Sequence, residues 1–158
     1  MRVDEDIVLT LGQIAALQSG YYAICGCATY VAISIVLRSK ERPVFVSDVL
    51  LSSSLVADSH AFAVVIVAHL MLVIPLMVVW VTQVLSKFRI VLDFVGTVFF
   101  LNAAVHGAFF GFPRSLLWWL VNIVELIIIV FASEFLLARR QAMRIAHLAH
   151  EIEGEGRG

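Results

Sequence analysis

Five polar or ionisable side chains stand inside long apolar stretches of the sequence, where such groups are rare. They are His69, Asn102, His106, Asn122 and Glu125. A carboxyl group at the centre of a membrane span costs roughly 2.5–3.5 kcal/mol or more and usually faces the interior of a helix bundle. One buried cluster, with Glu125 protonated or paired with a histidine, would satisfy all five. Two roles stay open for it: a proton relay or ion path, and interhelical hydrogen bonding without transport.

The two cysteines offer a second candidate chemistry, a thiol redox site. Cys25 and Cys27 lie two positions apart, and on a helix such side chains point about 200° apart. They are therefore not expected to bridge each other. Small residues in the same stretch favour close helix packing instead. These small residues are Gly12, Gly20, Gly26 and Ala28.

The composition places these residues in a membrane protein. Hydrophobic residues make up 61% of the 158 positions and charged residues 15%, and the mean hydropathy is +0.99, far from the values of soluble domains. The net charge of −1 gives no electrostatic case for binding nucleic acid. No phosphate-binding loop, zinc-protease motif or nucleophile elbow is present in the sequence. We therefore predict no catalytic residue, no cofactor and no metal site.

Four apolar stretches are long enough to cross a bilayer, which takes about 20 residues. Because they are continuous rather than alternating, they predict helices and not barrel strands. The predicted fold is an all-α membrane protein, a four-helix transmembrane bundle forming one domain over residues 1–158. Pro75 predicts a kink in the second span. The predicted spans are 13–37, 61–85, 92–112 and 115–137.

The distribution of Lys and Arg predicts the orientation. With four spans, both termini and the middle connection share one side, which holds seven of the eleven Lys and Arg residues. Both termini are therefore expected in the cytosol, with residues 38–60 as a lumenal loop and 138–158 as a cytosolic tail. In the loop, the apolar groups of residues 44–51 predict a short helix on the membrane surface, capped by Ser47 or Asp48.

Motifs near the ends of the spans resemble a known family, the Sys-type integral membrane proteins of the Golgi. Three stretches carry the resemblance: one opens the first span, one opens the third, and one runs from the third span through the fourth. The matching positions are Gln13, Gln18, Tyr21, Tyr22, Leu92, Asp93, Phe94, Phe112, Pro113, Trp118, Trp119 and Glu134. The chain departs from the family pattern at Glu125, where an uncharged residue is usual, which favours a local structural role for this carboxyl group.

The resemblance implies a receptor in the trans-Golgi membrane. Such proteins hold an N-terminally acetylated Arf-like small GTPase on that membrane and support vesicle-mediated protein transport. The expected partners are this GTPase and the lipid bilayer, and a homo-oligomer stays open. We expect the docking groove near the cytosolic face, lined by Gln18, Tyr22, Asp93 and Glu134.

Two other functions stay open from the residues alone. One is a small proton- or ion-coupled transporter subunit that uses Glu125, His69 and His106. The other is a thiol oxidoreductase that uses Cys25 and Cys27. A receptor should tolerate Glu125→Gln and lose function with the residues near the cytosolic face, whereas a transporter should show the reverse.

Overall fold

The computed structural model describes residues 3–38, 59–112 and 116–155, and this part of the chain is almost entirely helical. It contains four helices that are long and apolar enough to cross a membrane, which confirms the predicted all-α, four-span fold. The π-helical and 3-10 segments are labelled η. The elements are α1 (Val3–Arg38), α3 (Ser59–Ala68), η2 (His69–Val73), α4 (Ile74–Val84), η3 (Phe88–Ile90), α5 (Val91–Phe110) and α6 (Leu116–Glu155).

The first and last helices are longer than the apolar windows that announce them. The helix α1 begins at Val3, ten residues before the predicted span, and α6 continues to Glu155. Good helix formers such as Ala, Arg, Gln and Met follow the fourth apolar stretch, so the helix does not stop where the hydrocarbon ends. The predicted surface helix of residues 44–51 lies outside the residues that the structure describes. The candidate spans in the structure are Ile7–Ile35, Ala63–Val84, Phe88–Phe109 and Leu116–Leu148.

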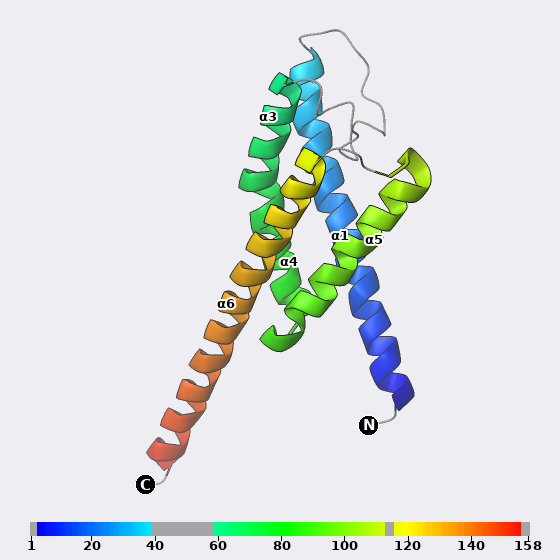
Figure 1. Ribbon diagram of the computed structural model, residues 1–158. Coiled ribbons are helices and arrows are strands. Elements are labelled where there is room, and N and C mark those ends of the chain that lie inside the picture. Colours follow the sequence, from blue (N-terminus) through cyan, green and yellow to red (C-terminus); the bar gives the residue numbers. More distant parts are fainter. Residues whose placement is uncertain (1–2, 39–58, 113–115, 156–158) are drawn as a thin grey trace.

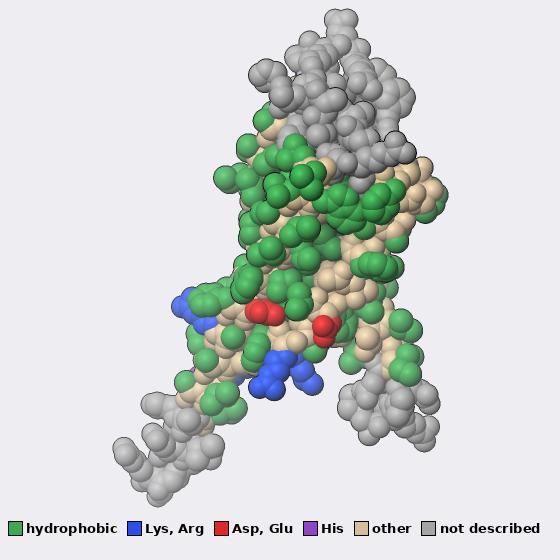
Figure 2. Space-filling view, viewed as in Figure 1, with side chains coloured by type: hydrophobic (Ala, Val, Ile, Leu, Met, Phe, Trp, Pro, Cys, Tyr) green, Lys and Arg blue, Asp and Glu red, His purple; other side chains and the backbone are tan. Residues whose placement is uncertain are grey.

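The four spans form an open bundle rather than a parallel stack. The helix α4 packs against both α1 and α6, and α5 contacts α1 and α6. Figure 1 shows that both termini lie at the same end of the bundle and that α1 and α6 diverge toward it. We call this end, which holds the start of α1 and the end of α6, the termini end. Figure 2 shows a hollow between the two diverging helices, with Lys and Arg side chains at its upper end, where the helices separate.

The second span contains a π-helical turn where the sequence predicts a kink. Proline has no backbone N–H and its ring clashes with the carbonyl group four residues earlier. Here the five residues of η2 precede Pro75, and the Ile74 N–H group bonds to the carbonyl oxygen of His69, five residues back. The wider turn takes the helix past the proline without ending it. Such π turns are frequent at functional sites, and this one begins at His69.

The packed interior is apolar and takes residues from every span. Leu17, Val73, Met77, Val91 and Ile129 are at most 1% exposed. The outer surface is apolar as well, and Figure 2 shows hydrophobic side chains over the middle of the bundle. Because lipid is as apolar as the core, packing and interhelical hydrogen bonds hold such helices together, and not the hydrophobic effect.

A close approach of α1 and α4 depends on Gly20. A Cβ atom at this position would lie 2.1 Å from Nε1 of Trp80, and the same Nε1 group donates a hydrogen bond of 3.1 Å to the carbonyl oxygen of Ala16. Ala28 is also buried, as expected for a packing residue. The expectation of close packing is wrong for Gly12 and Gly26, since a Cβ atom on either would meet nothing within 4 Å.

Replacement of Gly20 with Ala should loosen the α1–α4 contact. The new methyl group must displace the Trp80 indole and break its bond to Ala16, so we expect Tm to fall and stability to drop by about 1–3 kcal/mol. Thermal unfolding in detergent measures this. Gly26→Ala is the matched control, because it makes the same change in open space and should leave Tm unchanged or raise it. Equal behaviour of the two variants would contradict the packing assignment.

Candidate functional site

The most tightly organised polar group in the membrane centres on His69. Its Nδ1 atom lies 2.5 Å from Oε1 of Glu125, and its Nε2 atom lies 3.0 Å from the hydroxyl oxygen of Thr29. All three side chains are buried. Both ring nitrogens therefore have a partner, and we refer to these three residues as the His69 group.

The His69 group joins three spans. Thr29 belongs to α1, His69 opens the π turn of the second span, and Glu125 lies in the apolar part of α6. The contact of Glu125 with His69 and of His69 with Thr29 is what makes a carboxyl group tolerable in hydrocarbon.

The structure divides the five intramembrane polar residues among three separate sets of contacts. Asn102 donates from Nδ2 to the hydroxyl group of Tyr21 at 3.2 Å, which ties α5 to α1. Asn122 donates from Nδ2 to the carbonyl oxygen of Trp118, within its own helix, at 2.8 Å. The buried His106 packs on Trp118, with ring centroids 5.1 Å apart. Residues at a similar depth in the membrane therefore do not share one cluster, because each contacts only the side chains that face it.

Thr29 is the functional contact that sequence analysis missed. A threonine hydroxyl can bond to a carbonyl group of its own helix, so a single Thr in an apolar span gives no warning of a partner elsewhere. Both cysteines are free, with Cys25 buried and Cys27 exposed, as their spacing predicts.

The predicted docking residues on α1 lie near the middle of this helix, with Gln18 just before its midpoint and Tyr22 just after it. Gln13 donates from Nε2 to the carbonyl oxygen of Val84 at 3.4 Å, so this part of α1 lies beside the end of α4. Gln18 and Tyr22 follow, four residues apart and on one face. The Gln18 Oε1 atom and the Tyr22 hydroxyl group are buried and have no hydrogen-bond partner within the described part of the chain. Such groups carry a desolvation cost and are often places where a ligand or water binds.

The other two predicted docking residues are acidic and at least partly exposed. Asp93 is exposed in the first turn of α5, and Glu134 is half-buried in α6. Figure 2 shows acidic side chains close to Lys and Arg near the upper end of the hollow. Within the part of the chain that the structure describes, no hydrogen bond or ion pair joins any two of Gln18, Tyr22, Asp93 and Glu134. Among the described residues, the four are therefore not assembled into one contact.

Aromatic residues of the predicted motif shape the opposite end of the bundle. Phe112 packs on Trp119 with ring centroids 5.7 Å apart, and Trp118 meets Trp119 edge-on at 4.9 Å. Leu92 is exposed and Phe94 half-buried at the start of α5, while Pro113 lies outside the described residues. These contacts set the approach of α5 to α6 beside the turn that joins them.

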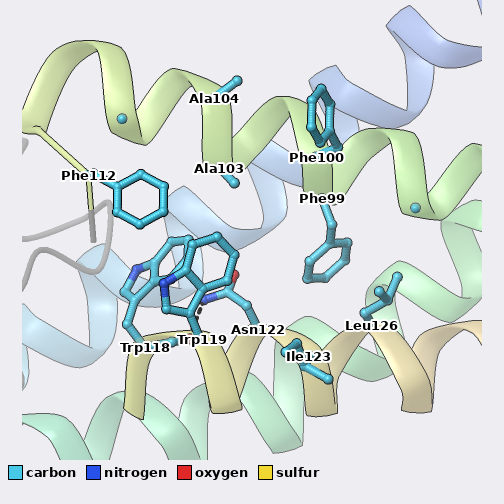
Figure 3. A pocket seen from close by; sticks show the side chains of 12 residues that line it. Phe99, Phe100, Ala103, Ala104, Phe112, Trp118, Trp119, Asn122, Ile123 and Leu126 are labelled. Carbon is cyan, nitrogen blue, oxygen red and sulfur yellow. Dashed lines mark hydrogen bonds between the residues drawn. The ribbon is translucent and has the colours of Figure 1, made fainter. Parts of the chain in front are cut away.

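An apolar groove of about 440 Å³ runs between α5 and α6. Figure 3 shows Phe112 above the two tryptophans at one end and Phe99 with Leu126 at the other, and Asn122 lies between, its amide bonded to Trp118. Its walls are almost wholly hydrophobic, and it opens at the surface that faces lipid.

The chain matches one protein family along nearly all of its length. The family, whose description reads "integral membrane protein S linking to the trans Golgi network", matches residues 3–147. This range includes the first three candidate spans, the fourth except for its last residue, and every residue of the His69 group. No curated protein and no solved structure matches the chain.

Removal of one partner from the His69 group should cost stability. Glu125→Leu leaves His69 Nδ1 without its acceptor, and we expect a loss of about 1–2 kcal/mol in unfolding measured in detergent or bicelles. His69→Leu should cost a similar amount, and the double variant should cost less than the sum of the two. Ile127→Leu, an exposed position on α6, is the control. Strictly additive losses would show that the two side chains do not act as a pair.

Proposed function

The chain belongs to the family of integral membrane proteins linking to the trans Golgi network, and from that premise we propose a receptor function. The receptor recruits an N-terminally acetylated Arf-like small GTPase to the trans-Golgi membrane and thereby supports vesicle-mediated protein transport. The carrying observation is that two buried acceptors, Gln18 Oε1 and the Tyr22 hydroxyl group, have no hydrogen-bond partner among the described residues. They lie near the middle of α1.

These acceptors suit the first turn of a helical peptide. A helix N-terminus presents N–H groups that have no partner in the helix, together with a partial positive charge. Acetylation removes the charge of the terminal amine, so such a peptide can enter an apolar groove. The carboxylates of Asp93 and Glu134 complement the same positive end. The described residues thus include buried acceptors and carboxylates, and an acetylated helix would bring the matching donors.

A second contact is what a weakly anchored GTPase needs. One amphipathic segment binds a bilayer only marginally, and stable placement takes two signals. An amphipathic helix that lies in a groove of a membrane receptor supplies the second signal and its specificity. The hollow between the diverging helices α1 and α6 (Figure 2) lies at the termini end, where such a helix would bind beside the bundle.

The contact between His69 and Glu125 is the observation that favours an alternative function, a proton- or ion-coupled transporter subunit. A buried histidine–carboxyl pair is a motif of proton-coupled transport, and a small transporter subunit would use it together with His106. In this structure, however, Thr29 occupies the second ring nitrogen of His69, and His106 packs on Trp118 instead. This arrangement favours a structural role for the pair.

The receptor function predicts a separation between two sets of acidic residues. Asp93→Ala and Glu134→Ala should each disperse the GTPase into the cytosol while the receptor stays in the Golgi, because the positive peptide end loses a carboxylate. Fluorescence microscopy of both tagged proteins measures this. Glu125→Gln is the control and should leave the GTPase on the membrane. A GTPase that stays in place in the first two variants would reject the groove, and loss with Glu125→Gln alone would favour transport.

The receptor function also needs the termini end to face the cytosol. Tags at the N-terminus and at the C-terminus should both react with antibodies after the plasma membrane alone is permeabilised. A tag inserted in the loop of residues 38–60 should react only after the Golgi membrane is opened. Termini that are protected together would place the groove in the lumen, where a cytosolic GTPase has no access.

A further inference from the structure

A basic surface with two adjoining cavities lies where α6 leaves the bundle beside the end of α4. The first cavity has a volume of about 200 Å³ and the second about 520 Å³, and both are lined by Gln83, Arg140 and Arg144. His147 completes the second cavity. None of the acceptors and carboxylates proposed for the GTPase lines either cavity, so this surface is a separate site. We call it the α4–α6 basic surface.

Hydrogen bonds fix the two helices against each other at this point. Arg140 donates from Nη1 to the carbonyl oxygen of Thr82 at 3.0 Å, and Gln141 donates from Nε2 to the carbonyl oxygen of Ser86 at 3.0 Å. Both acceptors lie at the end of α4, so the side chains close off carbonyl groups that the helix leaves unpaired. A guanidinium group has five N–H donors, and this bond holds Arg140 in place while its other donors stay available.

Helical spacing puts the basic groups in one row. Arg140, Arg144 and His147 follow at intervals of four and three residues, which on α6 places them on the same face. The preceding Arg139 is exposed but lines neither cavity. Arg139 and Arg140 thus carry the same charge, but only Arg140 lies on the helix face that lines the cavities.

The α4–α6 basic surface lies at the level where a membrane meets water. The second candidate span ends at Val84, next to the cavity residues Leu85 and Ser86. Apolar Leu85, Leu137 and Met143 line the cavities together with the arginines and glutamines. Among these described lining residues none is acidic. A site that is basic, rich in amide donors and partly apolar at this depth matches the headgroup and glycerol region of a lipid.

We propose that the α4–α6 basic surface binds the phosphorylated headgroup of an anionic phospholipid. Arginine donors pair with phosphate oxygens through charge-assisted hydrogen bonds, often two at a time. The amide groups of Gln83 and Gln141 lie beside them, and the apolar residues pack against the upper part of the lipid. Basic residues at a membrane surface each strengthen binding to anionic lipid severalfold.

Lipid titrations of the purified full-length protein in non-ionic detergent test the proposal without any GTPase, so its outcome is independent of the receptor function. Fluorescent short-chain phosphatidylinositol phosphate and phosphatidylserine should bind more tightly than phosphatidylcholine. Arg144→Gln should weaken anionic lipid binding about fivefold, and Arg144→Lys should weaken it less. Arg139→Gln, the matched control, removes the same charge and should change the affinity less than twofold.

Several outcomes would overturn the proposal. Equal losses with Arg139→Gln and Arg144→Gln would show a diffuse charge effect and no site, and an unchanged affinity in Arg144→Gln would remove the row from binding. Competition by inorganic phosphate as effective as that by the lipid would assign the cavities to a soluble anion. Thermal unfolding of each variant accompanies the titration. If Arg144→Gln fails to fold, Gln83→Leu on α4 replaces it, and full affinity in that variant counts against the site.

Discussion

The demand that every polar group in hydrocarbon find a partner inside the protein governs this fold. It is met most completely at His69, whose two ring nitrogens contact Glu125 and Thr29. The geometry of that contact depends on the π turn, because a regular helix would rotate His69 to another face of the second span. Pro75 accounts for the turn, since it supplies no N–H group and forces the preceding turn to widen. One proline thus sets the register on which three spans meet.

The polar contacts divide the bundle into a tied interior and an open end. The His69 group and the bond between Asn102 and Tyr21 join α1 to the other spans in the membrane. Beyond Gln13, the last residue of α1 that bonds to α4 in the part of the chain described, α1 departs from the bundle toward its N-terminus. On the other side, Arg140 and Gln141 hold α6 to the end of α4. The hollow between α1 and α6 lies beyond these hydrogen bonds to α4.

The sequence was sufficient for the spans because hydropathy along the chain reports depth directly. Hydropathy does not show how each helix is rotated about its own axis, and so does not show which face meets which neighbouring helix. In a soluble protein the apolar stripe shows which face is buried, but both faces of these spans are apolar. Gly20, Gly12 and Gly26 look alike in the sequence, and the structure shows a close contact at Gly20 alone among them. For the same reason the partners of His106 and Thr29 could not be assigned. The relation of Cys25 to Cys27 could be predicted, since their relative angle depends on helix period alone.

The helix α6 connects the features that matter for the proposed activities. It carries Glu125 in the membrane, Glu134 near the termini end and the row that begins with Arg140, all on one uninterrupted helix. At 1.5 Å per residue, about 23 Å of helix axis separates the first from the last of these three. A carboxyl group paired in hydrocarbon holds the helix at a fixed depth, because displacement along its axis would break the contact with His69. The anchor in the membrane therefore fixes the height at which the acidic and basic groups stand above it. In the proposed receptor, the position of these groups would therefore depend on a buried pair that contacts neither the peptide nor the lipid headgroups.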